Sequence, residues 1–276
     1  MFAIARNTLR EACQLRVVYV LVIASVVLVA IVAQLPKFTL SIYDDIKMSK
    51  DLAVATASLC GLLVALFASV QVITGEIENW TVVTVLSKPV RRWEFVVGKF
   101  AGLVVMLVLV FAVLAVGYTL VVWWGMWASI VDYQGVYPEL KRNFWTVAWQ
   151  AADEMGRALV LSLLQVAVLL GIAVACCVRV PMIVSAVAFF AVFVAGHFVG
   201  GVTALVEGGA GSVGRGAGTL LGVLIADLEA LNASQEVGTG QVVSAAVMAW
   251  GALYAALYSA AAVTAGVLLF RKREMM

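Results

Sequence analysis

Long, uninterrupted apolar runs constrain this chain more than any other feature. Six of them approach or exceed the roughly 20 residues that a helix needs to cross the hydrocarbon core of a bilayer. They cover residues 17–33, 52–74, 95–124, 158–178, 181–205 and 242–270. Lipid offers no partners to backbone N–H and C=O groups, so only helices and closed barrels cross it. The runs lack the alternation of a barrel strand, and the sequence therefore predicts an all-α polytopic membrane protein with six transmembrane helices.

The composition agrees with this class. Hydrophobic residues make up 64% of the 276 residues and charged residues 12%, whereas a soluble domain is nearer half apolar and a quarter charged. A net charge of +2 gives no reason to expect nucleic-acid binding. The four cysteines show no CxxC spacing and there is one histidine, so we expect no metal site. No linker divides the chain, which predicts a single transmembrane domain over residues 1–276.

Residues 1–16 precede the first run and have a helical period. Apolar side chains recur every three to four residues at Phe2, Ala5, Leu9 and Ala12. Arg6 and Arg10 belong to the polar face, which is typical of a helix that lies in the membrane interface. The alternative is the start of a cleaved signal peptide, but residues 17–33 exceed the usual apolar stretch of about 7–15 residues. We therefore expect an uncleaved interfacial helix.

Basic residues are distributed unevenly between the two sides of the predicted membrane. With the N-terminus inside, the inner segments carry 11 Lys and Arg residues and the outer segments 7, while the acidic residues number 5 and 11. Lys and Arg favour the cytoplasmic side. We therefore expect both termini to be cytoplasmic and the protein to lie in the inner or plasma membrane.

The connection between the second and third runs, residues 75–94, combines charge with an apolar stretch. Its ends carry Glu76, Glu78, Lys88, Arg91, Arg92 and Glu94, and its middle carries Trp80, Val83 and Leu86. A connection with only a linking role would be shorter or plainly hydrophilic. We expect a structured element on the membrane surface that presents a face to a partner. Glu94 stands where a capping box has its acid, but Arg91 replaces the Ser or Thr of that motif.

These residues form the pattern GE-x-E-x-x-T, then a short apolar run, then K-P-x-x-R-x-E and G-K-x-x-G. The pattern comprises Gly75, Glu76, Glu78, Thr81, Leu86, Lys88, Pro89, Arg92, Glu94, Gly98, Lys99 and Gly102. It resembles the ABC-2-type permeases, the membrane subunits of ABC exporters, which have a type V-like fold. The opening IARNTLREA and the later ADLEALNASQEVGTGQ are similar to the same family. The latter implies short external helices, within residues 206–241, before the last membrane helix.

The resemblance implies a function and a set of contacts. Residues 75–94, here called the coupling segment, would form a cytoplasmic coupling helix that sits in a groove of a separate ATP-binding cassette subunit. The residues implied for this contact are Glu76, Glu78, Trp80, Thr81, Val83, Leu86, Lys88, Pro89, Arg91, Arg92 and Glu94. The permease would work as a homodimer or as a heterodimer with a related permease, surrounded by membrane lipid.

The sequence contains no GxxxxGK[ST] pattern, so the chain cannot bind ATP in a phosphate-binding loop. ATP hydrolysis is expected in the partner, and no cofactor is expected in this chain. Two other classes are the alternatives. An intramembrane enzyme is disfavoured because the runs lack paired carboxylates or a catalytic dyad. A secondary transporter is disfavoured because the runs are almost free of charge. The few polar groups in the runs favour an amphiphilic or lipid-like cargo, or mechanical transmission to another protein.

Three weaker patterns have structural alternatives. GAGSVG at 209–214 matches GxGxxG, but dinucleotide binding needs that motif between a strand and a helix, so a flexible loop is favoured. Ser212 with His197 would suggest a serine protease, but the surroundings of Ser212 are not GxSxG. His197 is either a functional intramembrane group or a hydrogen-bonded structural one. Gly98–Gly102 and Gly196–Gly200 are GxxxG pairs that allow close helix packing.

Aromatic residues concentrate in and beside the predicted outer connection 125–156. They are Trp123, Trp124, Trp127, Tyr133, Tyr137, Phe144, Trp145 and Trp149. Amphipathic rings prefer the membrane–water interface. We expect an aromatic belt at the outer surface, and the alternative is an aromatic ligand site.

Overall fold

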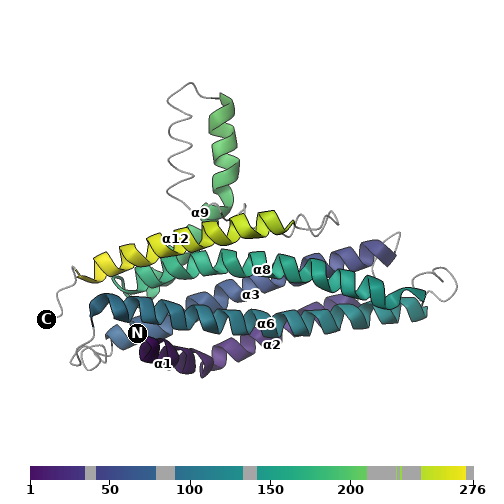
Figure 1. Ribbon diagram of the computed structural model, residues 1–276, viewed down its shortest axis with the longest axis horizontal. Helices are drawn as coiled ribbons and strands as arrows, with labels where there is room; N and C mark the ends of the chain where they lie inside the picture. Colours follow the sequence, from purple (N-terminus) through teal and green to yellow (C-terminus); the bar gives the residue numbers. More distant parts are fainter. Residues whose placement is uncertain are drawn as a thin grey trace.

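The computed structural model describes residues 1–34, 42–78, 91–132, 142–209, 228, 231 and 244–271. Its helices are α1 (Phe2–Cys13), α2 (Arg16–Gln34), α3 (Ile42–Ser69), α4 (Gly75–Glu78), α6 (Arg92–Asp132), α8 (Phe144–Cys177), α9 (Met182–Gly209) and α12 (Ala245–Arg271). A π-helical turn, η1 (Val70–Thr74), joins α3 to α4. In Figure 1, α2, α3, α6, α8 and α12 run alongside one another, and α1 lies at the end of the bundle where α12 finishes.

Five helices in the described ranges are long and apolar enough to cross a membrane. The candidate spans are Arg16–Ala33, Asp44–Thr74, Trp93–Ala128, Phe144–Cys177 and Ala245–Phe270. A shorter apolar stretch, Met182–Phe198, lies in α9. Figure 1 shows part of α9 (green) projecting away from the bundle. The chain is thus a multi-pass, helical membrane protein, and the count of six spans stays a prediction.

The helices extend beyond the apolar runs of the sequence. The outer connections predicted around residues 34–51 and 125–156 are largely helical, because α3 begins at Ile42, α6 reaches Asp132 and α8 begins at Phe144. Apolar runs mark only the part of a helix that lipid surrounds. The first turn of α3 is acidic, with Asp44 and Asp45, and carboxylates are favoured at a helix N-terminus by the helix dipole. Such turns continue a helix without continuing its apolar pattern.

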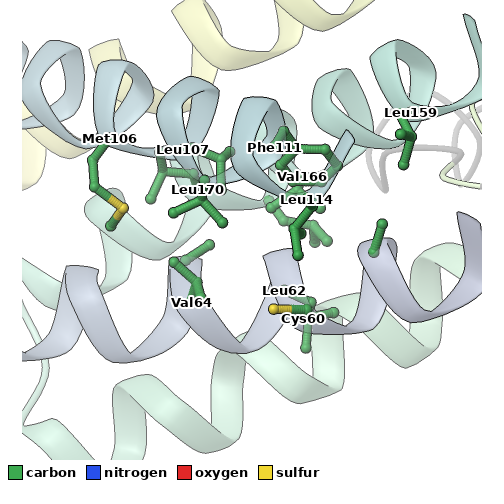
Figure 2. Close-up of a cluster of buried hydrophobic side chains, with 14 of the residues drawn as sticks. Cys60, Leu62, Val64, Met106, Leu107, Phe111, Leu114, Leu159, Val166 and Leu170 are labelled. Carbon is green, nitrogen blue, oxygen red and sulfur yellow. The ribbon is translucent and has the colours of Figure 1, made fainter. Parts of the chain in front are cut away.

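The core lies between α3, α6 and α8. Figure 2 shows its side chains, among them Cys60, Leu62 and Val64 from α3, Met106, Leu107, Phe111 and Leu114 from α6, and Leu159, Val166 and Leu170 from α8. In the most apolar window of α3 and of α8, 67% of the residues are buried, against 17% in α2 and 28% in α12. Thus α3 and α8 are central, and α2 and α12 leave apolar faces for lipid or for another chain.

Small residues bring α8 and α12 together. A Cβ atom added at Gly266 of α12 would lie 3.0 Å from Cα of Ala175 on α8, and one at Gly171 of α8 would lie 3.3 Å from Cα of Ser259. Lipid tails are as apolar as the helices, so membrane helices associate through such close packing rather than through the hydrophobic effect. This contact fixes α12 against α8, one of the two central helices.

Candidate functional site

The structure describes the two ends of the coupling segment. Of the residues implied for partner contact, Trp80, Thr81, Val83, Leu86, Lys88 and Pro89 lie outside the described residues. Glu78 ends α4 and Arg92 begins α6, and the structure describes only their backbone. Glu76, Arg91 and Glu94 are described with their side chains. The coupling helix itself therefore stays a prediction, and the site is built from the residues that frame it.

The far end of the coupling segment is an ordered helix start. Glu94 N–H donates to the Arg91 carbonyl at 2.9 Å, and Arg91 N–H donates to Glu94 Oε2 at 3.2 Å. The second bond is the half of a capping box that the acid supplies. The arginine side chain cannot supply the other half of the capping box. The bond from Arg91 N–H to the Glu94 carboxylate nevertheless satisfies one of the backbone donors that have no partner within the helix. As a result, α6 begins at Arg92, before the apolar run predicted from residue 95.

The near end of the coupling segment follows a π-helical turn. The turn η1 (Val70–Thr74) is almost wholly buried, and α4 continues from it through Glu76. Single π turns inside α-helices are rare and often occur at functional positions. Here the Val72 carbonyl accepts a hydrogen bond from Lys99 Nζ at 3.2 Å. A side chain of α6 thus binds the backbone of the widened turn.

Lys99 of α6 is the centre of a buried ion cluster. Its side chain is 3% exposed, and Nζ lies 2.6 Å from Glu76 Oε1 and 3.4 Å from Glu11 Oε2. With the Val72 carbonyl, these oxygens provide an acceptor for each of the three N–H bonds of the ammonium. A buried charge is tolerated only with such partners. Lys99, Glu76 and Glu11, here called the Lys99 cluster, join α6, α4 and α1.

Aromatic rings cover the Lys99 cluster. Nζ of Lys99 lies 5.7 Å from the centroid of the Phe95 ring, a distance at which a cation is attracted to the face of a ring. The Phe95 ring stacks on Phe270 of α12 with centroids 5.8 Å apart. Both rings are 1% exposed. The last residues of α12 therefore help to exclude water from the ammonium.

The cluster holds two carboxylates for one ammonium. Burial raises the pKa of the Glu11 carboxyl, the charge of Lys99 lowers it, and the neighbouring charge of Glu76 raises it, with a net rise above the ordinary 4.5. The ammonium between the two carboxylates offsets part of the cost of burial, and the partial exposure of Glu11 to solvent offsets another part.

The Lys99 cluster lies beside two glycines of α6, Gly98 and Gly102, against which α1 packs closely. A Cβ added at Gly102 would lie 2.6 Å from the Ala5 carbonyl oxygen and 2.7 Å from Cβ of Thr8, and one at Gly98 would lie 3.0 Å from Cβ of Ile4. The Gly98–Gly102 pair therefore serves close helix packing, as the GxxxG pattern allows. Only glycine at position 102 leaves room for the backbone of α1.

A second buried ion pair links α3 to α8. Lys50 Nζ donates to Glu154 Oε2, and the two side chains are 6% and 22% exposed. Both residues belong to segments that the sequence predicted to be outer connections, yet both lie on long helices. In contrast, the Arg157–Asp153 pair on α8, at 2.8 Å, is 34% and 59% exposed. The Lys50–Glu154 pair lies far along α3 from Glu76, so buried ion pairs fasten α3 near both of its ends.

His197 joins α9 to α8. Its Nδ1 lies 3.0 Å from the Phe193 carbonyl oxygen and its Nε2 lies 3.4 Å from Nε2 of Gln165, which is buried. A neutral ring with its proton on Nδ1 donates to the carbonyl and accepts from the amide. The structure thus supports the hydrogen-bonded structural role that was one of the two alternatives. Ser212, the suggested partner of His197, lies outside the described residues.

The other predicted outer features are described only in part. Of residues 206–241, the described ones are the end of α9, with Gly209, together with Leu228 and Leu231. The predicted short external helices and the GAGSVG loop beyond Gly209 lie outside them. Leu228 N–H donates to the Gly196 carbonyl of α9 at 3.2 Å.

The aromatic residues that the structure describes gather where α6 meets the start of α8. The Trp123 ring contacts those of Trp145 and Trp149, with centroids 6.1 and 5.4 Å apart, and its Nε1–H donates to the Ala148 carbonyl at 3.0 Å. Trp145 and Trp149 are 64% and 63% exposed. Rings that are half packed and half exposed suit the predicted belt better than an enclosed ligand site.

An apolar cavity of about 870 Å³ lies between α8, α9 and α12. Small side chains such as Ala175, Ala191 and Ala262 line it, and Arg179 is the charged residue among those that line it. Its chemistry suits an apolar chain with a polar end.

Two residues of the Lys99 cluster were not predicted as site residues. Lys99 is a single cation inside an apolar run. An ionisable residue in a membrane helix is by default a candidate functional residue, and it needs an oppositely charged or polar partner. Glu11 is the one acidic residue in the first 43 residues. These two signals in the sequence could have identified both residues, although not their contact.

Comparison with known proteins places nearly the whole chain in one family. The family model described as "ABC-2 family transporter protein" matches residues 2–274. The match extends from α1 to beyond the end of α12 and includes both ends of the coupling segment. No curated protein matches the sequence.

Proposed function

Since the chain belongs to the ABC-2 transporter family and is a permease subunit of an ABC transporter, we propose that it exports its cargo with ATP hydrolysed in a separate subunit. That subunit binds the coupling segment, and the segment passes the movement of the ATP cycle to the membrane helices. The residues that carry this contact are those implied by the sequence pattern, from Glu76 to Glu94.

The observation that carries the proposal is the contact between Lys99 and Glu76. The coupling segment leaves α4 after Glu78 and enters α6 at Arg92. The 2.6 Å bond between the two side chains ties its two ends together. A partner that displaces the segment therefore acts on α3 and α6 at once. Both helices enter the core of Figure 2, so the displacement reaches the centre of the bundle.

The assembly is a pair of permease chains with ATP-binding subunits on the cytoplasmic side. Helices α2 and α12 leave most of their apolar windows unburied. Exposed apolar residues on α2 include Tyr19, Val20, Ile23 and Ile31. These faces are available to a second permease, either identical or related, or to lipid. The mass of the purified complex in nanodiscs distinguishes one permease chain from two.

The partner contact is tested by substitution in the coupling segment. The tagged chain is purified from its own cells, and ATP-binding proteins that accompany it are identified by mass spectrometry. We expect Leu86→Asp and Glu76→Ala to remain in the membrane but to lose the ATP-binding subunit or its transport-linked ATP turnover. Met48→Asp is the matched control, because it places the same charge on an exposed apolar residue of α3. Full complex formation and transport by both variants would refute the proposal.

Two further measurements test the division of labour and the orientation. The chain purified alone should not turn over ATP, because it has no phosphate-binding loop, and turnover by a pure sample would contradict this. Reporter fusions at residue 276 and within residues 210–216 should lie on opposite sides of the membrane. The same side for both would overturn the predicted topology, with cytoplasmic termini in the inner or plasma membrane.

We propose an amphiphilic or lipid-like cargo. The cavity between α8, α9 and α12, with Arg179 in its mostly apolar lining, supports this class. Amphiphiles should stimulate ATP turnover by the reconstituted complex, whereas small hydrophilic solutes should not. Stimulation by hydrophilic solutes alone would assign the cargo to another class.

A further inference from the structure

The helix α1 has contacts that a lipid anchor does not need. Thr8 and Ala12 are completely buried in the described structure. The backbone of α1 at Ala5 fits against Gly102 so closely that a Cβ there would lie 2.6 Å from the Ala5 carbonyl oxygen. An interfacial helix that only contacts headgroups keeps its polar face in water and its apolar face in lipid. This one instead uses one face to pack against α6.

An ion contact adds to this packing. Glu11 of α1 reaches the same ammonium that binds Glu76, so Lys99 holds α1 and α4 through one group. The two bonds are unequal, with 2.6 Å to Glu76 and 3.4 Å to Glu11. The Glu11 side chain is also 37% exposed, against 16% for Glu76. The contact with α1 is therefore the weaker one, and its loss leaves the tighter Lys99–Glu76 bond in place.

We propose that Glu11 and Lys99 are positioning residues that make α1 part of the moving unit of the transporter. Through them, α1 is fastened to the π-helical turn before the coupling segment and to the helix after it. A displacement of the coupling segment moves α1 together with α3 and α6. The inference rests on the proposed function for the source of that movement, but the fastening itself belongs to this chain alone.

The fastening is tested in the full chain without a partner. Amide hydrogen exchange is measured by mass spectrometry in nanodiscs for residues 2–13 and 70–78. In Glu11→Ala, we expect exchange in residues 2–13 to rise about two- to fivefold, because helix opening no longer has to break a partly exposed ion contact. Exchange in residues 70–78 should stay unchanged, since Lys99 still binds Glu76 and Val72. Glu11→Gln keeps an oxygen acceptor and should restore protection.

Arg10→Ala is the matched control for this measurement. It truncates the neighbouring residue on α1, which is exposed, and should leave protection of residues 2–13 as in the wild type. Equal exchange in Glu11→Ala and the wild type would overturn the fastening. The same loss of protection in Arg10→Ala would also overturn it, because the effect would then not depend on Lys99.

The movement is tested in the complex with its ATP-binding subunit. Adding ATP with vanadate should change exchange in residues 70–78 and in residues 2–13 of the wild type. In Glu11→Ala only residues 70–78 should respond, and Glu11→Gln should regain both responses. A role confined to stability would not remove the response of one segment and keep that of the other. A wild-type complex in which residues 70–78 respond and residues 2–13 do not would refute the inference.

If the proposed function is wrong, the experiments give a different result. No ATP-binding subunit would then accompany the wild-type chain, and the assignment of a moving unit would fall with the proposed function. The exchange of residues 2–13 in Glu11→Ala and Arg10→Ala would still decide whether Lys99 fastens α1.

Discussion

The ammonium of Lys99 donates a 2.6 Å hydrogen bond to the carboxylate of Glu76, 23 residues before it in the chain. This bond closes the stretch that contains the coupling segment into a loop anchored at one end of the bundle. Because both groups are buried or nearly so, the bond is poorly screened by solvent, unlike a surface ion pair. The two helices that flank the coupling segment are thus held in a fixed relation.

Replacement of Lys99 should be among the most destabilising single changes in this chain. Lys99→Met leaves the carboxylates of Glu76 and Glu11 and the Val72 carbonyl without their cation. Loss of one member of a buried ion pair costs about 3 kcal/mol or more, and less where a partner is partly exposed, as Glu11 is. We expect a clear drop in the thermal unfolding midpoint, measured in detergent by tryptophan fluorescence. Lys99→Arg keeps the charge and should lose less. Equal midpoints for Lys99→Met and the wild type would contradict a structural role of the cluster.

Stability should depend on pH through Glu11. Its pKa is raised in the folded protein, mainly by burial, so the folded state binds the proton more tightly than the unfolded state does. The contribution of this group is fully present below its ordinary pKa of 4.5 and is lost as the pH rises through the raised value. Lys99 and Glu76 face Glu11 and set the size of the effect.

The measurement for Glu11 is a comparison of two proteins. The midpoint of Glu11→Gln, which cannot titrate at this position, is subtracted from that of the wild type at each pH. The wild-type midpoint should fall relative to that of Glu11→Gln as the pH rises above 4.5. A difference that is flat, or that moves the other way, would show that Glu11 is not held as the structure has it.

A side chain at position 102 should displace α1. Gly102→Leu would collide with the Ala5 carbonyl and with Thr8, and backbone cannot yield as a flexible side chain can. In a background without native cysteines, Thr8→Cys should resist maleimide in the parent and react after Gly102→Leu. Gly156→Ala is the control, since nothing lies within 4 Å of a Cβ there. Continued protection of Thr8→Cys would mean that the position of α1 does not depend on its packing against Gly102.

The Lys50–Glu154 pair should matter more than the neighbouring pair on α8. Glu154→Ala leaves a buried ammonium unpaired, and we expect a loss of about 1–3 kcal/mol, below the full cost of a buried pair because Glu154 is partly exposed. Asp153→Ala breaks the more exposed pair with Arg157, where about 0.5 kcal/mol or less is expected. The thermal midpoints of the two variants test this contrast. The double variant Lys50→Glu, Glu154→Lys, which exchanges the two charges, should lose less stability than Glu154→Ala. Equal losses would remove the distinction by burial.

The sequence by itself determined the class of the protein. Apolar runs of membrane length allow only helices, and the pattern from Gly75 to Gly102 led to the family that the comparison assigns to residues 2–274. It also predicted α1, because a helical period of apolar residues survives in a short segment. The six-span count, the topology and the coupling contacts remain predictions.

Only the tertiary structure decided which charges meet. Lys99, Glu76 and Glu11 lie on three separate helices, and a π-helical turn brings the Val72 carbonyl to the same ammonium. No local pattern encodes that meeting, since it depends on how α1 packs against Gly98 and Gly102. Helix ends also needed the structure, because polar turns continue α3 and α8 where the apolar signal stops. Lysine and glutamate usually lie on protein surfaces, and they form an ion cluster here because Lys99 is buried. Burial depends on how the helices pack, which the sequence pattern does not state.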